Sequence, residues 1–344
     1  MDKGIMIISH ASDIDGVGSA ALISIKYGVD PNNIFFSDYS TESLNAIRGA
    51  IKKEAEKGTS LFITDLGVNG KTVPIFKEIL RTIKHRGGRV FWFDHHPWSS
   101  PAIKELTPLC DISIIGENEL FCATEITRKE LDLNDKFSKY FCRIVHFSDF
   151  AIRPRLKKEY DLVGAYALSI ALYRMQGAEK NISGLRHIVR VLTQRRLLDK
   201  KIRADANAYR KINDRNTKKM LKDVYLGDDI AMGFAGDIQK TYACMKLMEK
   251  TGKDIGIYVN TSEGRGHMRS VRNELTELAN RFGGGGHPHA SGFTPSLKRY
   301  NRFRTAADKQ RLLDDIEREL KEIQKNNKSG KPLKASKSRT PIFG

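Results

Sequence analysis

Short apolar runs alternate with amphipathic segments over the first part of the chain. The apolar runs predict four buried strands, at Gly4–His10, Ile34–Ser37, Leu61–Asp65 and Arg89–Phe93. The segments between them predict helices at Gly16–Tyr27, Glu42–Glu56 and Thr72–Arg86. Strands and helices that alternate with short turns are typical of a parallel sheet covered by helices. In such α/β sheets, ligands bind at the carboxyl ends of the strands.

The pattern changes after residue 150. Residues 151–220 show no strand signal, and we expect helices at Val163–Arg174, Asn181–Leu198 and 199–222. A second, smaller α/β region starts near Asp229. Its predicted elements are the strands Ile230–Phe234, Ile255–Asn260 and His267–Arg272 and the helices Tyr242–Lys250 and Ala306–Gln324. We therefore expect an N-terminal parallel-sheet domain (1–155), a basic helical linker (156–225), a smaller α/β domain (226–325) and a disordered tail (326–344).

Composition narrows the class of protein. The chain has 344 residues, of which 40% are hydrophobic, so it can bury real cores and is not disordered as a whole. No run approaches the roughly 18 apolar residues that span a bilayer, and the N-terminus shows no signal-peptide pattern. Four cysteines without a C-x-x-C pair exclude a disulfide scaffold and a Cys-rich zinc module. We expect a cytoplasmic protein with no membrane partner.

Positive charge is concentrated in two segments. The chain carries 59 basic and 41 acidic residues, net +18. Residues 1–150 hold 18 basic and 20 acidic residues, net −2, whereas residues 151–220 hold 18 and 6, net +12. Residues 325–344 hold 6 and 0, net +6. Concentrated charge of this kind indicates a polyanionic partner, and the competing interpretation is a solvated lysine-rich surface.

Carboxylate and imidazole groups follow the predicted strands at the points where the strands end. The motif SHASDIDG follows the first strand, LFITD ends the third, FDHH ends the fourth, and HFSDFA follows a helix. All of these groups can converge on one edge of the sheet. Oxygen and nitrogen ligands without sulfur suit a hard or borderline divalent metal, and so many aspartates and histidines suit two ions better than one. The groups are His10, Asp13, Asp15, Asp65, Asp94, His95, His96 and Asp149.

Structural interpretations compete for each residue taken alone. An EF-hand loop would need an acidic or amide residue where Ala11 stands, so that interpretation fails. A lone Asp65 is more often a helix N-cap, and a lone His95-His96 pair is more often ordinary surface or core histidine. The assignment of Asp149 to this site depends on the local sequence only. Three strand ends that all carry such groups favour a functional site.

A glycine run near the C-terminus is the second chemical feature. The segment Phe282–Phe293 reads FGGGGHPHASGF, and its backbone N–H groups could form an anion-binding nest beside His287. The competing interpretation is a flexible loop, which the His-x-His and the apolar residues after the glycines disfavour. Upstream, Arg265, Arg269 and Arg272 lie around a predicted strand, and arginine forks suit phosphate.

A family resemblance is carried by the motifs SHASDIDG, ITDLG, FDHH and GGGGHPHASG. Together they resemble the DHH phosphoesterases, in the branch with a C-terminal DHH-associated domain, over about residues 1–325 less the basic helical segment. The resemblance implies manganese-dependent hydrolysis of phosphate esters in a cleft between two domains. Ala11-Ser12 departs from the Asn-Pro of many oligonucleotide-cleaving relatives.

The resemblance also implies roles for individual residues. One metal would be bound by His10 and Asp13, and the other by Asp15, His95 and Asp149. Asp65 would bridge two Mn²⁺ ions, for which Mg²⁺ or Co²⁺ could substitute, and His96 would contact the scissile phosphate or the leaving oxygen. The implied residues for the substrate phosphate are Arg269, Gly284, Gly285, Gly286, His287 and His289.

The basic segments decide between the substrates of this family. A long phosphate backbone can contact many cations at once, so the basic segments favour a polymeric substrate. We therefore expect a RecJ-like exonuclease that acts on single-stranded DNA or RNA, in DNA repair or RNA processing. The alternative is a nanoRNase, a mononucleotide (pAp-type) phosphatase or a cyclic-dinucleotide phosphodiesterase. A third hypothesis is a binding or scaffold protein with a vestigial site, against which the intact ligand set argues. The tail ends in Pro341-Ile342-Phe343-Gly344, whose two apolar side chains are suited to recruiting a helicase or replication factor. The alternative is that the lysines of the tail simply add nonspecific affinity for nucleic acid. The oligomeric state stays open.

Overall fold

The computed structural model describes residues 4–116, 120–150, 152 and 154–328. The chain divides into two compact units, Met1–Arg210 and Lys211–Gly344, and each unit is described by itself. The expected tail falls outside the described residues, apart from its first three residues, which belong to the last helix. No helix among the described residues combines the length and the apolar character that crossing a membrane would require.

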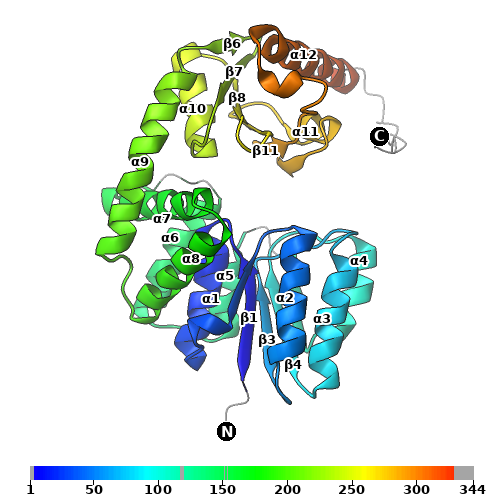
Figure 1. Cartoon of the computed structure of the whole chain (residues 1–344), viewed down its shortest axis with the longest axis vertical. Coiled ribbons are helices and arrows are strands. Elements are labelled where there is room, and N and C mark those ends of the chain that lie inside the picture. Colours follow the sequence, from blue (N-terminus) through cyan, green and yellow to red (C-terminus); the bar gives the residue numbers. More distant parts are fainter. Residues whose placement is uncertain (1–3, 117–119, 151, 153, 329–344) are drawn as a thin grey trace. The chain divides into compact units, whose positions relative to one another are not determined.

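The first unit is built on a five-stranded parallel sheet (Figure 1). Its strand order is β2-β1-β3-β4-β5, so the chain changes direction across the sheet between the neighbours β1 and β3. Such a switch point is where open α/β sheets bind ligands. The expected parallel α/β fold is confirmed. The strands are β1 (Ile5–His10), β2 (Ile34–Ser37), β3 (Ser60–Thr64), β4 (Arg89–Asp94) and β5 (Ile112–Ile115).

Two apolar clusters cover the two faces of this sheet. Successive strand residues point to opposite faces, so Ile7 packs with α1 on one face, while Ile8 packs with α2 and α3 on the other. The first cluster also takes in α5 to α8, and the second takes in α4. The helices are α1 (Ile14–Tyr27), α2 (Thr41–Glu54), α3 (Val73–His85), α4 (Ser100–Leu106), α5 (Ala123–Glu130), α6 (Lys136–Asp149), α7 (Lys157–Met175) and α8 (Ala178–Thr193).

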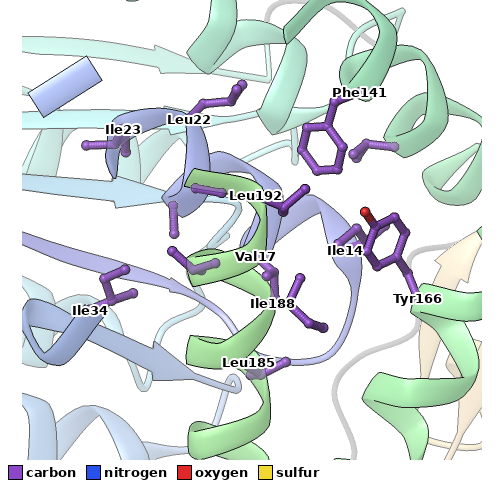
Figure 2. Close-up of a cluster of buried hydrophobic side chains, with 14 of the residues drawn as sticks. Ile14, Val17, Leu22, Ile23, Ile34, Phe141, Tyr166, Leu185, Ile188 and Leu192 are labelled. Carbon is purple, nitrogen blue, oxygen red and sulfur yellow. The ribbon is translucent and has the colours of Figure 1, made fainter. Parts of the chain in front are cut away.

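The helices α7 and α8 differ from the expectation of a linker, because they are part of the first unit. Leu185, Ile188 and Leu192 of α8 are buried in the same cluster as Val17 of α1, as Figure 2 shows. These residues recur every three or four positions, so α8 has an apolar stripe that must be covered. Only α9 (Lys200–Met220) runs across the boundary between the two units.

The second unit holds a six-stranded mixed sheet of order β10-β11-β9-β8-β7-β6, in which only β7 and β8 are parallel neighbours. The helix α10 (Lys240–Thr251) packs on one face, and α11 (Thr276–Arg281) and α12 (Ala306–Lys328) pack on the other. The strands are β6 (Val224–Leu226), β7 (Ile230–Ala235), β8 (Ile255–Asn260), β9 (Arg265–Ser270), β10 (Gly285–His287) and β11 (Ala290–Phe293).

Candidate metal centre

The turn from β1 into α1 places three of the predicted ligands side by side. His10 is the last residue of β1, and Asp13 is the N-cap of α1, where its Oδ1 accepts hydrogen bonds from the backbone N–H groups of Asp15 and Gly16. Position 16 requires glycine, because a Cβ atom there would lie 2.3 Å from the His10 carbonyl oxygen. The close approach of α1 to β1 therefore holds His10, Asp13 and Asp15 at the switch point.

Two neighbouring strand ends supply the next groups. Asp65 directly follows β3 in a left-handed backbone conformation, with φ of 54°, and its N–H donates to the Phe93 carbonyl at 3.0 Å. An aspartate in this conformation is uncommon, and such residues cluster at functional sites. His95 directly follows β4. Both side chains are buried at the edge of the sheet where the β1–α1 turn lies.

The side chains approach one another closely around Asp65. His10 Nδ1 lies 3.3 Å from Asp13 Oδ2 and 3.4 Å from Asp65 Oδ2. His95 Nε2 lies 3.6 Å from Asp65 Oδ1, 3.8 Å from Asp15 Oδ2 and 3.7 Å from Asp149 Oδ2. Three sets each place their ligand atoms within 4.8 Å of one another. The sets are His10-Asp13-Asp65, Asp15-His95-Asp149 and Asp65-His95-His96.

Asp149 reaches this cluster from a helix rather than from a strand end. It is the last residue of α6, and α6 packs against α1 and α5. Asp15 is additionally fixed by α5, because its carboxylate accepts hydrogen bonds from the N–H groups of Ala123 (2.8 Å) and Thr124 (2.7 Å). A carboxylate has about four acceptor positions, so Asp15 keeps capacity for a cation.

Crowding of acidic groups makes the cluster electrostatically costly without a cation. Burial and the charges of Asp15 and Asp13 hold the pKa of Asp65 well above its usual range. Burial, followed by the charge of Asp15, raises the pKa of Asp149 to about 8. Burial lowers the pKa of His10, but Asp13 and Asp65 outweigh it and raise that pKa to about 10. Each shift has the direction expected where several carboxylates share a site with too little positive charge.

Orphaned ligand atoms show that divalent cations fit this donor set. Three buried atoms, His10 Nδ1, Asp65 Oδ2 and His95 Nε2, have no hydrogen-bond partner among the residues that the structure describes. An unpaired buried polar atom is costly, and imidazole nitrogen and carboxylate oxygen are ligands of borderline and hard divalent metals. The cluster is therefore suited to metal binding.

His96 has a different environment from His95. Its Nδ1 lies 2.7 Å from Asp94 Oδ1, and Asp94 Oδ2 accepts a hydrogen bond from Trp98 Nε1 at 2.8 Å. Burial lowers the pKa of His96, but Asp94 outweighs burial and raises it. The fully buried Asp94 thus hydrogen-bonds to Nδ1 of the His96 imidazole, and Nε2 is the nitrogen that could contact a substrate.

Two residues at the centre were not assigned a role from the sequence. Asp94 was noted as a candidate, but its hydrogen bonds to His96 and Trp98 depend on side-chain geometry. Tyr39 was missed, and its ring lies 5.0 Å from the His10 ring and 6.4 Å from the His96 ring. Its position shortly after β2 was the one available signal, because β2 ends at the same edge of the sheet as β1.

Arg269 in the second unit has an incompletely satisfied guanidinium. Its Nη2 donates to Thr241 Oγ1 at 3.0 Å and its Nη1 to the Met268 carbonyl at 3.2 Å, while its Nε is buried without a hydrogen-bond partner. Burial lowers the pKa of Arg269. A half-buried cation with unused hydrogen-bonding capacity favours an anion nearby.

The glycine run forms a turn and the edge strand β10. Gly286 lies opposite Ser291 of β11 with φ of 140°, and a Cβ atom on Gly284 would lie 1.9 Å from the Gly292 carbonyl oxygen. Close packing against β11 therefore requires glycine, independently of any ligand. The register places Arg269 opposite Ala290, the neighbour of the exposed His289, whose carbonyl accepts from the Ser270 N–H. The side chain of His287 lies outside what the structure describes.

Comparison with known proteins agrees with this fold. No family model matches the chain. Oligoribonuclease NrnB from Bacillus subtilis is 31% identical over 96 residues, which are 26% of this chain and 21% of that protein. The match therefore spans only about a fifth of that curated relative.

Solved structures match over most of the chain. RecJ from Thermus thermophilus in complex with Mn²⁺ shares 14% identity at a TM-score of 0.53, covering 92% of this chain and 52% of RecJ. The pGpG-specific phosphodiesterase PggH from Vibrio cholerae shares 16% identity at a TM-score of 0.51, covering 90% and 98%. The fold and the short sequence match together confirm the resemblance of this chain to the DHH phosphoesterases, of the RecJ-like and nanoRNase-like kind.

Proposed function

We propose that this protein is a metal-dependent phosphodiesterase that hydrolyses phosphodiester bonds of nucleic acids. The observation that carries the proposal is the buried cluster around Asp65, whose orphaned nitrogen and oxygen atoms belong to sets of ligand atoms that lie within 4.8 Å of one another. Nucleic acid as the substrate class is supported by the names of the relatives: RecJ, an oligoribonuclease and a pGpG phosphodiesterase.

The ligand assignment follows two of the three sets. One divalent cation would be held by His10, Asp13 and Asp65, and a second by Asp15, His95 and Asp149. Asp65 would also serve the second cation, because its Oδ1 lies 3.6 Å from His95 Nε2. Mn²⁺ is the preferred ion, and Mg²⁺ or Co²⁺ also suits these ligands. Bound divalent cations supply an acidified water nucleophile and neutralise charge on the phosphate.

His96 is the proton donor of the proposed reaction. Its raised pKa keeps the imidazole cationic over more of the neutral pH range, and Asp94 fixes Nδ1 so that Nε2 can donate to the leaving oxygen. In the second unit, Arg269, the glycines Gly284, Gly285 and Gly286, His287 and His289 would bind a substrate phosphate. The Gly284 N–H already donates to the Ala279 carbonyl at 2.9 Å, so Gly284 would contribute close approach of the backbone and not this N–H. The partly unsatisfied guanidinium of Arg269 is the support for this assignment.

A single-stranded polynucleotide is the substrate that the charge distribution favours. Residues 151–220 carry a net charge of +12. A long phosphate backbone could contact many of these cations, whereas a dinucleotide could not. We therefore propose a RecJ-like exonuclease acting in DNA repair or RNA processing in the cytoplasm, where the four free thiols would stay reduced. Short oligonucleotides are the second candidate, because two of the relatives are named for short substrates. The proposal that a helicase or replication factor binds the tail depends on the sequence alone.

One incubation tests the proposal and separates the two candidates. The purified protein is incubated with Mn²⁺ and with strands of 2 and of about 30 nucleotides, labelled at either end, with and without chelator. We expect hydrolysis that chelation abolishes and that is faster on the long strand. Asp65→Asn should be inactive, whereas Glu56→Gln, a matched change of an exposed carboxylate, should behave as wild type. Activity of Asp65→Asn close to that of wild type would contradict the assignment.

A further inference from the structure

Large apolar side chains are exposed immediately after the Asp149 end of α6. Ile152 is 45% exposed, Leu156 59% and Tyr160 56%. Leu156 is the N-cap of α7, and the Tyr160 N–H donates to its carbonyl at 3.1 Å, so the two residues lie one turn apart at the start of the helix. Scattered exposed apolar residues need no explanation, whereas three within nine positions are a candidate binding surface.

Basic side chains surround these apolar groups. Arg155, Lys157 and Lys158 are exposed, and the one carboxylate between them and Tyr160, that of Glu159, is buried. The Glu159 carboxylate pairs with Arg143 of α6. The surface between residues 155 and 160 is therefore both apolar and positively charged. A polyanion that carries flat apolar groups complements it, which is the chemistry of single-stranded nucleic acid.

The Tyr140 ring of α6 extends the same character. The Arg143 guanidinium carbon lies 5.0 Å and the Lys158 Nζ 5.9 Å from the centre of this ring, so two cations from adjacent helices share one aromatic ring. Together with the Arg143–Glu159 ion pair, this contact joins α6 to α7. The corner between the two helices is thus held in place.

The corner begins at the metal centre within the same unit. Asp149 is the last residue of α6, and the ring of the next residue, Phe150, lies 6.3 Å from the His95 ring. The Ile152 N–H donates to the Phe147 carbonyl at 3.0 Å, which turns the chain back along the end of α6. The exposed apolar groups therefore start three residues from a proposed metal ligand.

We propose that this corner is a stacking platform for single-stranded nucleic acid, formed by Ile152, Leu156 and Tyr160 and flanked by the cations Arg155, Lys157 and Lys158. Bases of a strand whose scissile phosphate is at the metal centre stack on Leu156 and Tyr160, and the cations contact the phosphates between them. The inference rests on the proposed function and narrows its substrate to strands longer than a dinucleotide. Paired bases of a duplex would not expose the faces that stack.

Two variants and two matched controls test the platform. Leu156→Ala/Tyr160→Ala removes the apolar groups, and Lys157→Ala/Lys158→Ala removes two charges. Ile103→Ala changes an apolar residue on α4 that is 40% exposed, and Lys57→Ala changes an exposed lysine away from the corner. Melting curves check folding, and Tyr160→Phe keeps the ring and should retain wild-type binding.

Binding is measured by fluorescence anisotropy with a labelled thymidine strand of about 30 nucleotides in chelator, so that hydrolysis plays no part. We expect about tenfold weaker binding for the apolar double variant, the loss expected when one or two bases no longer stack. The lysine double variant should flatten the salt dependence of binding. With Mn²⁺, kcat/KM on the long strand should fall about tenfold more than kcat/KM on a dinucleotide for both variants.

Each result decides a separate claim. Unchanged binding in both variants, or an equal fall in kcat/KM on both substrates, overturns the platform while leaving the phosphodiesterase proposal standing. A shift from dimer to monomer in the apolar variant assigns the surface to a second copy of the chain and also overturns it. A wild-type protein that binds the strand but hydrolyses neither substrate refutes the proposed function, and the binding comparison still tests the platform.

Discussion

The most direct test of the metal centre is the stability of the Asp149→Asn protein without metal. In the folded protein the pKa of Asp149 is raised from 3.8 to about 8, chiefly by burial and then by Asp15. A carboxyl group whose pKa is raised on folding destabilises the folded state above its unfolded pKa, and the cost grows until pH passes the folded pKa. Asparagine carries no charge, so the variant should be more stable than wild type whenever cations are absent.

The size of the effect follows from the shift in pKa. Holding Asp149 protonated from pH 3.8 to pH 7 corresponds to about 4 kcal/mol at 1.36 kcal/mol per unit. Relaxation around the site reduces this figure, so we expect about 2–4 kcal/mol, or roughly 5–10 °C in Tm at neutral pH. The advantage of the variant should be small near pH 4 and greatest at and above about pH 8. With Mn²⁺ the order reverses, because only wild type keeps the ligand.

Thermal melting in chelator and in Mn²⁺, at several pH values between about 4 and 8, measures both effects. Asp199→Asn is the matched control of opposite sign. Although burial acts against it, hydrogen bonds from the Ile202 N–H and from His187 lower the pKa of Asp199, so its ionised form stabilises the fold and its loss should destabilise at neutral pH with or without metal. If Asp149→Asn instead lowers Tm in chelator at every pH, Asp149 is a structural partner of His95 and the reasoning fails.

Three further predictions concern single positions. Asp65→Ala should lose at least about a thousandfold in kcat and bind less Mn²⁺ by metal analysis, because Asp65 belongs to the set with His10 and Asp13 and its Oδ1 also lies 3.6 Å from His95 of the other set; full metal content would contradict this. Arg269→Ala should keep its metal and raise KM, whereas Arg272→Ala, a change of an exposed arginine, should leave both metal content and KM unchanged; loss of manganese from Arg269→Ala would move this residue to the metal centre. Asp94→Asn should lower kcat about ten- to a hundredfold and shift the alkaline limb of the kcat–pH profile to lower pH, because Asp94 raises the pKa of His96; an unshifted limb would remove His96 as the proton donor.

The local pattern of the chain was enough to predict the parallel α/β fold of the first unit and the positions of most candidate ligands. Buried strands such as β1 and β3 are short continuous apolar runs, and a polar group directly after such a run must lie at the carboxyl edge of the sheet. His10, Asp65 and His95 are of this kind. Their convergence follows from strand polarity alone, which the order of the sequence already contains.

Other features depended on contacts between distant segments. The elements α4, β5 and α5 carry weak patterns and were not predicted. A helix was expected before Asp149 but without bounds, and this helix, α6, is the element that delivers Asp149 beside His95. The basic segment that was expected to be a linker includes α7 and α8, which pack on α1 and belong to the core of the first unit. The charges on one face of a helix do not indicate which residues cover its other face. The Asp94–His96 contact and the half-satisfied guanidinium of Arg269 are likewise decided by side-chain geometry. Only the folded chain brings these groups within hydrogen-bonding or ligand distance, because that distance is set by packing across tens of residues rather than by spacing along the sequence.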